Sequence, residues 1–255
     1  MKFTPLARTA FLASVLSLTS ALFAAGNGPT PYPAQSDEAA WPGVGPIRVG
    51  AWMNDNRVYS WTLREKDQGA VVFVGDSLVG GWKGLGKAFP GIKVANRGVG
   101  GDVSRGVLFR FQEDVLDLHP RAIVFCVGSN DLSAHGKTDH TIANLATLVQ
   151  HAHEANPATP LIFCTIPPRN APNAPIVPGS LDALNLRLKA FAQGKPNIVV
   201  VDLFTALANA DGTPNPDFIG KDGIHITPAG YEKWTSLLRP VFTSLGIVAE
   251  TPVAK

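Results

Sequence analysis

The sequence predicts a three-layer α/β/α sandwich built around a five-stranded parallel β-sheet. Short β-branched and apolar runs alternate with longer stretches whose apolar residues recur at helical spacing, an order typical of parallel sheets covered on both faces. The chain has 255 residues, of which 45% are hydrophobic and 16% charged, enough to enclose one sizeable core. We therefore expect one domain, over residues 51–246.

Five apolar runs are the candidate strands. They are nearly continuous in apolar residues, as expected for strands with a helix layer on each face, and cover residues 70–74, 92–96, 122–127, 161–165 and 198–202. Four amphipathic stretches are the candidate helices, at residues 107–115, 142–152, 181–191 and 231–245. Their apolar stripes predict core packing and no chemistry.

The first 25 residues predict an export signal. Lys2 and Arg8 precede an apolar run over residues 10–23, and small residues follow it. Leu22 and Phe23 fit poorly to a small-residue cleavage rule, so an uncleaved anchor is the competing interpretation, although the run is short for a membrane span. A cleaved signal predicts a secreted or periplasmic protein with no stable membrane insertion.

Two further segments flank the predicted domain. Residues 26–50 are rich in Pro, Gly and Ala and predict an N-terminal extension that either wraps the domain or stays loose. Residues 247–255 predict a C-terminal tail. The chain has 22 basic and 20 acidic residues, and loss of Lys2 and Arg8 would balance them. This charge balance excludes the basic footprint of a nucleic-acid-binding protein.

The sequence predicts neither an organic cofactor nor a metal. The glycine-rich segments lack the Lys-Ser/Thr ending of a phosphate-binding loop, and the histidines lack partners at metal-ligand spacing. Cys126 and Cys164 each lie inside an apolar run. Buried free thiols are expected there, because a disulfide between neighbouring central strands would be strained.

Polar residues follow the first three candidate strands directly. Asp76 and Ser77 come after the first, Gly101 stands in a glycine-rich loop after the second, and Asn130 follows the third. Ligands bind outside the carboxyl ends of parallel strands, so these residues are expected to lie together. The backbone N–H of Ser77, that of Gly101 and the Asn130 amide could supply an oxyanion hole.

Asp222 and His225 complete a candidate catalytic triad with Ser77. A serine hydroxyl becomes nucleophilic when a histidine takes its proton, and the histidine needs a carboxylate to fix its tautomer. The spacing of Asp222 and His225, with Gly223 between them, allows the carboxylate to fold back onto Nδ1 while Nε2 faces Ser77. Asp202, which closes the fifth candidate strand, is the alternative acid.

These blocks resemble the SGNH, or GDSL, hydrolase family, from about residue 52 to residue 242. The resemblance implies a flavodoxin-like sandwich with Ser77 as nucleophile, Asp222 and His225 as acid and base, and Gly101 and Asn130 in the oxyanion hole. The motifs at 72–77, 98–102 and 127–130 are most similar to the catalytic subunits of intracellular platelet-activating factor acetylhydrolase, which implies a short acyl group. Two features depart from that subgroup: the export signal, and Asp131 where the subgroup usually has a second Asn.

The expected function is serine-dependent hydrolysis of short acyl esters, with acetyl favoured, on a small-molecule or glycan alcohol. An acyltransferase using the same site and a lysophospholipase- or thioesterase-like hydrolase of longer chains stay open. A non-catalytic glycan-binding module would need no Ser77, and a general α/β hydrolase would have a glycine where Val79 stands. Trp82 and Arg169 are the candidate substrate-binding residues, and a plain connector is the alternative interpretation of the Pro-rich loop that carries Arg169. The sequence does not predict the oligomeric state.

Overall fold

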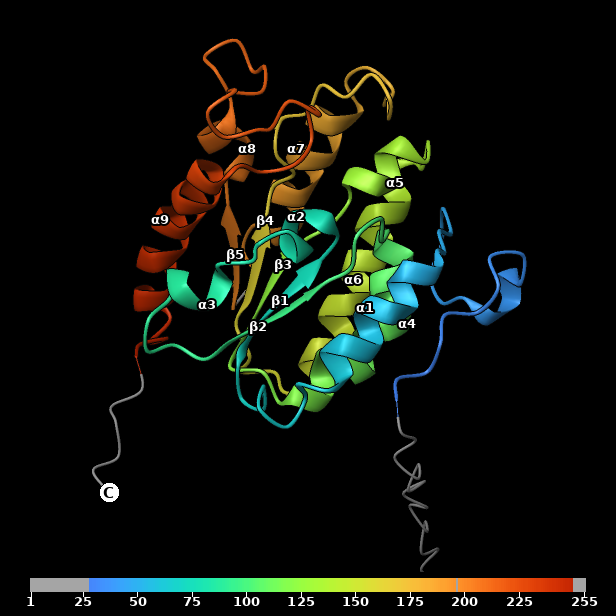
Figure 1. Ribbon diagram of the computed structural model, residues 1–255, viewed down its shortest axis with the longest axis vertical. Coiled ribbons are helices and arrows are strands. Elements are labelled where there is room, and N and C mark those ends of the chain that lie inside the picture. The colour runs from blue at the N-terminus through green and yellow to red at the C-terminus, as the bar shows by residue number, and fades with distance from the viewer. Residues whose placement is uncertain (1–27, 196, 250–255) are drawn as a thin grey trace, which may run out of the picture.

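A parallel five-stranded sheet forms the centre of the molecule, which confirms the predicted fold class (Figure 1). The computed structural model describes residues 28–195 and 197–249. Its strands pair in the order β2-β1-β3-β4-β5, and their bounds lie within two residues of the predicted ones: β1 (Val71–Gly75), β2 (Val94–Gly98), β3 (Ala122–Cys126), β4 (Leu161–Cys164) and β5 (Ile198–Val201).

Helices cover both faces of this sheet, as Figure 1 shows. One face carries α2 (Ser77–Gly80), α3 (Leu85–Ala88), α8 (Leu203–Leu207) and α9 (Pro228–Ser244). The other carries α4 (Ser104–Asp114), α6 (Thr138–Ala155) and α7 (Ser180–Ala192). The remaining elements are α1 (Ala51–Trp61), α5 (Ser129–Ser133) and the 3-10 turns η1 (Glu38–Ala40) and η2 (Leu116–Leu118).

Alternate strand residues face the two layers. Val71 and Phe73 of β1 join the cluster that contains Trp234 of α9, whereas Val72 and Val74 join the cluster of α4 and α6. Each fully buried side chain of this size contributes roughly 1.5–3 kcal/mol relative to leaving it exposed. Cys126 and Cys164, on neighbouring strands of this core, are buried free thiols, as expected. The sheet therefore forms a rigid base for the loops at its carboxyl edge.

The N-terminal extension wraps the domain over its described residues, 28–50. Tyr32 and Trp41 stack with their ring centroids 5.6 Å apart and are buried with Met53 and Val99. The Arg105 guanidinium of α4 donates to the Trp41 carbonyl at 3.2 Å, and to further carbonyls of the segment. Aromatic burial and buried hydrogen bonds thus fasten the extension to the domain.

The packed domain also continues beyond residue 246, where the predicted tail begins. Ile247 is buried in the core, and its N–H donates to the Phe242 carbonyl at 2.8 Å. The predicted signal peptide and residues 250–255 of the tail lie outside the described residues. Of the helices that the structure describes, none has the length and hydropathy to cross a membrane.

Candidate active site

Ser77 lies where β1 gives way to α2, at the carboxyl edge of the sheet. Asp76 caps the short helix, since its Oδ1 accepts the Leu78 N–H at 2.9 Å. This bond satisfies one of the backbone donors that a helix start leaves free. Asp76 therefore braces the turn that presents Ser77.

His225 connects Ser77 to Asp222. Its Nε2 lies 2.9 Å from the Ser77 Oγ, and its Nδ1 lies 2.5 Å from the Asp222 Oδ2. The other carboxylate oxygen of Asp222 accepts the backbone N–H groups of Ile224 and His225, each at 3.0 Å. Burial opposes ionisation of Asp222, but the hydrogen bonds from His225 and these backbone groups together lower its pKa to about 2. An ionised Asp222 holds the proton on Nδ1 and leaves the Nε2 lone pair for Ser77.

The turn between Asp222 and His225 requires glycine at position 223. Gly223 has a φ of +72°, and a Cβ there would lie 1.8 Å from the Asn170 carbonyl oxygen. The Asn170 N–H in turn donates to the Gly223 carbonyl at 2.9 Å. The Pro-rich loop after β4 therefore contacts the triad turn, and a side chain at position 223 would displace one from the other.

The last helix anchors the other side of the turn. Thr227 caps α9 by accepting the Gly230 N–H at 3.1 Å, and Pro228 occupies the first helical position. Both residues suit a helix start. His225 thus stands three residues before the first residue of a well-anchored helix.

Three hydrogen-bond donors lie at or after the carboxyl ends of β1, β2 and β3. Within the described residues, the backbone N–H groups of Ser77 and Gly101 have no hydrogen-bond partner. Gly101 has a φ of +88°, a conformation that favours glycine. The Asn130 Nδ2 donates to the Asp102 carbonyl at 3.0 Å, which leaves its second N–H available. Free donors of this kind are what an oxyanion hole requires.

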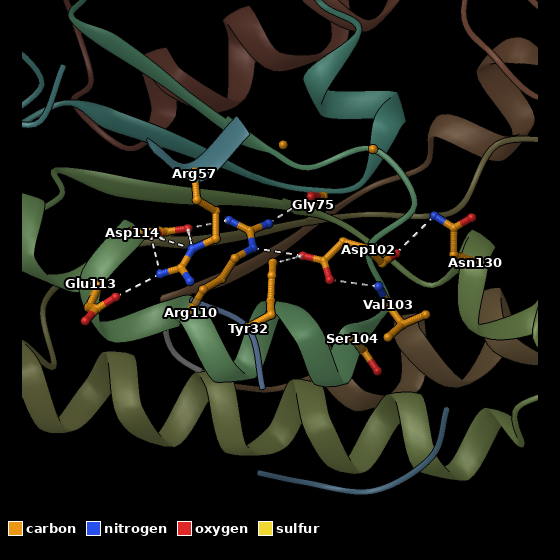
Figure 2. A network of polar contacts seen from close by, with 12 residues as sticks. Tyr32, Arg57, Gly75, Asp102, Val103, Ser104, Arg110, Glu113, Asp114 and Asn130 are labelled. Carbon is orange, nitrogen blue, oxygen red and sulfur yellow. Dashed lines mark hydrogen bonds and ion pairs between the residues drawn. The ribbon is translucent and has the colours of Figure 1, made fainter. Parts of the chain in front are cut away.

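A buried arginine ties the strand of Ser77 to the loop of Gly101. Arg110 donates to the Asp102 Oδ2 at 2.8 Å and to the Gly75 carbonyl at 3.0 Å (Figure 2). Burial raises the pKa of Asp102 to about 6, and the Arg110 charge, which lowers it, keeps the carboxylate ionised at neutral pH. The backbone carbonyl of the same Asp102 receives the Asn130 amide.

The same network extends to α1. Asp114 accepts from Arg110 at 3.2 Å and from Arg57 at 3.0 Å, and Arg57 also pairs with Glu113 at 2.8 Å. Figure 2 shows these contacts as one chain of interactions from Glu113 to Asn130. Both arginine side chains are fully buried. Removing one partner of a buried pair costs roughly 3–5 kcal/mol, so this network holds the loop geometry rigidly.

Asp131, which follows β3, connects its segment to the start of α4, which follows β2. Its carboxylate accepts the Ser104 N–H at 2.9 Å and the Ser104 hydroxyl at 2.5 Å, and Thr141 donates to it at 3.2 Å. Ser104 is the first residue of α4, where a carboxylate favourably meets the free N–H groups of a helix start. The residue that departs from the subgroup pattern therefore joins α5, α6 and α4.

The two predicted substrate residues have other neighbours in the structure. Trp82 is only 3% exposed and packs against Tyr231 and Trp234, with ring centroids 5.0 and 4.9 Å away. Arg169 donates to the carbonyl and hydroxyl of Ser129, both at 2.8 Å, and to the Ala174 carbonyl. Burial lowers the pKa of the Arg169 guanidinium. Trp82 thus belongs mainly to the core and Arg169 mainly to the loop scaffold; substrate contact by either stays a prediction.

The alternative acid, Asp202, has a structural position. It caps α8 and pairs with Lys189 at 2.7 Å. Among the described residues, no group of three or more His, Cys, Asp or Glu side chains could hold a metal ion.

Sequence reasoning gave no role at the site to two residues beside the oxyanion loops. Arg48 Nη1 donates to the Asn130 Oδ1 at 3.0 Å, and Trp52 Nε1 donates to the Gly100 carbonyl at 2.8 Å. Both precede the first strand and so lie outside the loops at the carboxyl ends of the strands, where the sequence predicts the site. No motif or residue spacing in the sequence indicates these contacts, because each joins residues that are far apart in the chain.

Asp76 makes the stability of the fold depend on pH. Its side chain is fully buried, its Oδ2 has no hydrogen-bond partner among the residues that the structure describes, and burial raises its pKa from 3.8 to about 7. The folded state then keeps a proton that the unfolded state loses above about pH 4. We therefore expect the unfolding free energy to fall by on the order of 4 kcal/mol as the pH rises from about 4 to about 7.

Urea unfolding of the native chain and Asp76→Asn over this pH range measures that effect. The asparagine keeps an acceptor for the Leu78 N–H but cannot ionise, so the decline should be smaller in the variant, which keeps only the contribution of other buried carboxyls such as Asp102. Asp211→Asn, at an exposed aspartate, is the matched control and should follow the native curve. If the unfolding free energies of Asp76→Asn and the native chain changed with pH in the same way, Asp76 would not retain the proton in the folded state.

Comparison with known proteins places the chain in a family. Residues 73–233, well over half of the chain, match the GDSL-like Lipase/Acylhydrolase family. The platelet-activating factor acetylhydrolase IB subunit alpha2 of Rattus norvegicus is 27% identical over 212 residues, which cover 80% of this chain and 88% of that protein.

Solved structures give the same result. An acylhydrolase candidate from Bacteroides fragilis matches with a TM-score of 0.67 and 30% identity, over 77% of this chain and 99% of that chain. A GDSL-like lipase from Bacteroides thetaiotaomicron matches with a TM-score of 0.63 and 27% identity, over 70% and 90%. By motif order, sheet topology and overall similarity, the chain belongs to the GDSL-like lipase/acylhydrolase family and is a carboxylic ester hydrolase.

Proposed function

We propose that the chain hydrolyses short acyl esters, with acetyl as the favoured acyl group, through an acyl-enzyme on Ser77. The observation that carries this proposal is the contact of His225 Nε2 with Ser77 Oγ at 2.9 Å, with Asp222 bound to the other ring nitrogen. This is the arrangement that a serine nucleophile needs at neutral pH.

The reaction has two halves. In the first, Ser77 Oγ attacks the acyl carbon, its proton passes to His225 Nε2, and the carbonyl oxygen becomes an oxyanion held by the N–H groups of Ser77, Gly101 and Asn130. The C–O bond to the alcohol then breaks, and His225 protonates the leaving oxygen. In the second, His225 takes a proton from water, the resulting hydroxide attacks the acyl carbon, and the acid leaves as Ser77 recovers its proton.

Similarity supports a short acyl group. The Rattus norvegicus relative is named an acetylhydrolase, and the chain covers 88% of its length. We extend the acetyl preference to this chain on that basis. The alcohol partner is a small molecule or a glycan, since the triad side chains Asp222 and His225 are about half exposed and leave room for it.

A second candidate, hydrolysis of longer acyl chains, is favoured by one groove. It has a volume of about 740 Å³ and lies between the segment after α2 and the first half of α9. Trp82, Tyr231 and Ile226 supply apolar surface to its lining, which also contains the charged residues Lys83, Lys87, Glu232 and Arg239. Ile226 directly follows His225. An acyl chain leaving the triad on this side would find apolar surface to cover.

Hydrolysis of p-nitrophenyl esters from acetate to palmitate separates the two candidates. We expect kcat/KM to fall steeply beyond butyrate, because the proposed site serves a short acyl group. A maximum at octanoate or longer would instead assign the groove to the acyl chain. Adding glycerol to the acetate assay and measuring acetylglycerol against acetate tests the acyltransferase alternative, for which the transferred ester would dominate.

A further inference from the structure

We propose that Arg48 of the N-terminal extension is a positioning residue that holds the Asn130 amide in its oxyanion-binding orientation. The inference rests on the proposed role of Asn130 as an oxyanion donor. It assigns a part in the reaction to a segment that precedes the sheet and all of the family motifs.

Two contacts fix which way the Asn130 amide points. Arg48 Nη1 donates to the amide oxygen at 3.0 Å, and the amide nitrogen donates to the Asp102 carbonyl at 3.0 Å. A guanidinium can only donate and a backbone carbonyl can only accept. Rotating the amide by 180° would place its NH2 group against the Arg48 guanidinium and its oxygen against the Asp102 carbonyl. Neither hydrogen bond could then form. The two partners together therefore hold the nitrogen on the side of the Asp102 loop.

This orientation is the one that catalysis needs. Nδ2 carries two hydrogens, and the Asp102 carbonyl takes one of them. The second hydrogen stays available to the oxyanion. With the amide reversed, an oxygen lone pair would replace that hydrogen and would repel the developing negative charge.

The charge of Arg48 adds to this effect. A hydrogen bond from a guanidinium is roughly twice as strong as a neutral one, and it polarises the amide toward a more positive N–H end. Asn130 thus becomes a better donor without any direct contact between Arg48 and the substrate. Loss of Arg48 should reduce transition-state stabilisation more than substrate binding.

The backbone on both sides of Arg48 is fastened, so its side chain starts from a fixed point. On one side, the Asn144 amide accepts the Val44 N–H at 2.9 Å and donates to the Val44 carbonyl at 2.8 Å. On the other, Trp52 donates to the Gly100 carbonyl at 2.8 Å. These anchors reduce the entropy that an exposed arginine would lose in binding the Asn130 amide.

A double-mutant cycle with p-nitrophenyl acetate tests the proposal. Asn130→Ala should lower kcat by about a hundredfold. Arg48→Ala should lower kcat by about tenfold, the loss that corresponds to one charge-assisted hydrogen bond, with KM nearly unchanged. In the Asn130→Ala background, Arg48→Ala should cause no further loss, because the group on which it acts is gone.

Three further variants sharpen the cycle. Arg48→Lys keeps a cationic donor and should recover part of the rate, whereas Arg48→Gln, which keeps a neutral donor, should recover less. Arg187→Ala removes an exposed arginine that pairs with Asp139 and should leave kcat unchanged. Equal melting temperatures across the set establish that the kinetic differences do not come from unfolding.

Three outcomes would overturn the inference. An unchanged kcat for Arg48→Ala would remove its role, and an equal loss in both backgrounds would show that it acts independently of Asn130, for example by touching the substrate. A normal rate for Asn130→Ala would remove the oxyanion role of Asn130 as well. Ser77-dependent hydrolysis that persists in the first two cases would show that the proposed function stands while the inference fails.

Discussion

Ser77→Ala is expected to abolish measurable ester hydrolysis. Loss of the nucleophile from a serine triad lowers kcat by about a millionfold, because His225 then has no group to activate for acyl transfer. The fold should survive, since the hydroxyl contacts His225 Nε2 while the helix start depends on the neighbouring Asp76. The measurement is p-nitrophenyl acetate hydrolysis together with thermal unfolding.

A covalent probe makes this test independent of substrate choice. A fluorophosphonate reacts with an activated serine, so the native chain should gain one adduct by mass spectrometry, on the peptide that contains Ser77. Ser77→Ala should gain none, whereas Ser244→Ala, which removes an exposed hydroxyl at the end of α9, should label like the native chain. Labelling of Ser77→Ala at another serine, with hydrolysis retained, would move the nucleophile elsewhere.

Local patterns account for most of what the sequence predicts correctly. The strands lie within two residues of their predicted bounds because buried parallel strands need continuous β-branched and apolar residues. The contact between Asp222 and His225 depends on a turn of four residues, with glycine where φ is positive. Such features need only near neighbours in the chain, so spacing and residue type specify them.

Contacts between distant segments were not predictable in this way. Arg48 and Asn130 are 82 positions apart, and their pairing depends on how the extension packs over α4 and α6. Trp82 follows the nucleophile closely in sequence, but the stacking of its ring on Tyr231 of α9 depends on the packing of distant segments.

Asp222→Asn is expected to lower kcat by about ten-thousandfold while leaving the fold intact. Asp222 Oδ1 accepts two backbone N–H groups, so the amide oxygen of the variant should remain at that position. The amide nitrogen then takes the place of Oδ2, which lies 2.5 Å from His225 Nδ1. Because it donates a hydrogen, Nδ1 must become the acceptor, and the ring proton moves to Nε2, where it faces Ser77 and blocks proton transfer.

Asp202→Asn is the matched control, because Asp202 is the other acid that sequence order allowed. Its carboxylate pairs with Lys189 and caps α8, at a partly exposed position where an ion pair contributes about 0–1 kcal/mol. We expect its kcat to stay within about twofold of the native value, since none of its contacts orients the histidine. Steady-state rates on p-nitrophenyl acetate for both variants decide between the two acids: a large loss for Asp202→Asn with a normal rate for Asp222→Asn would reverse the assignment.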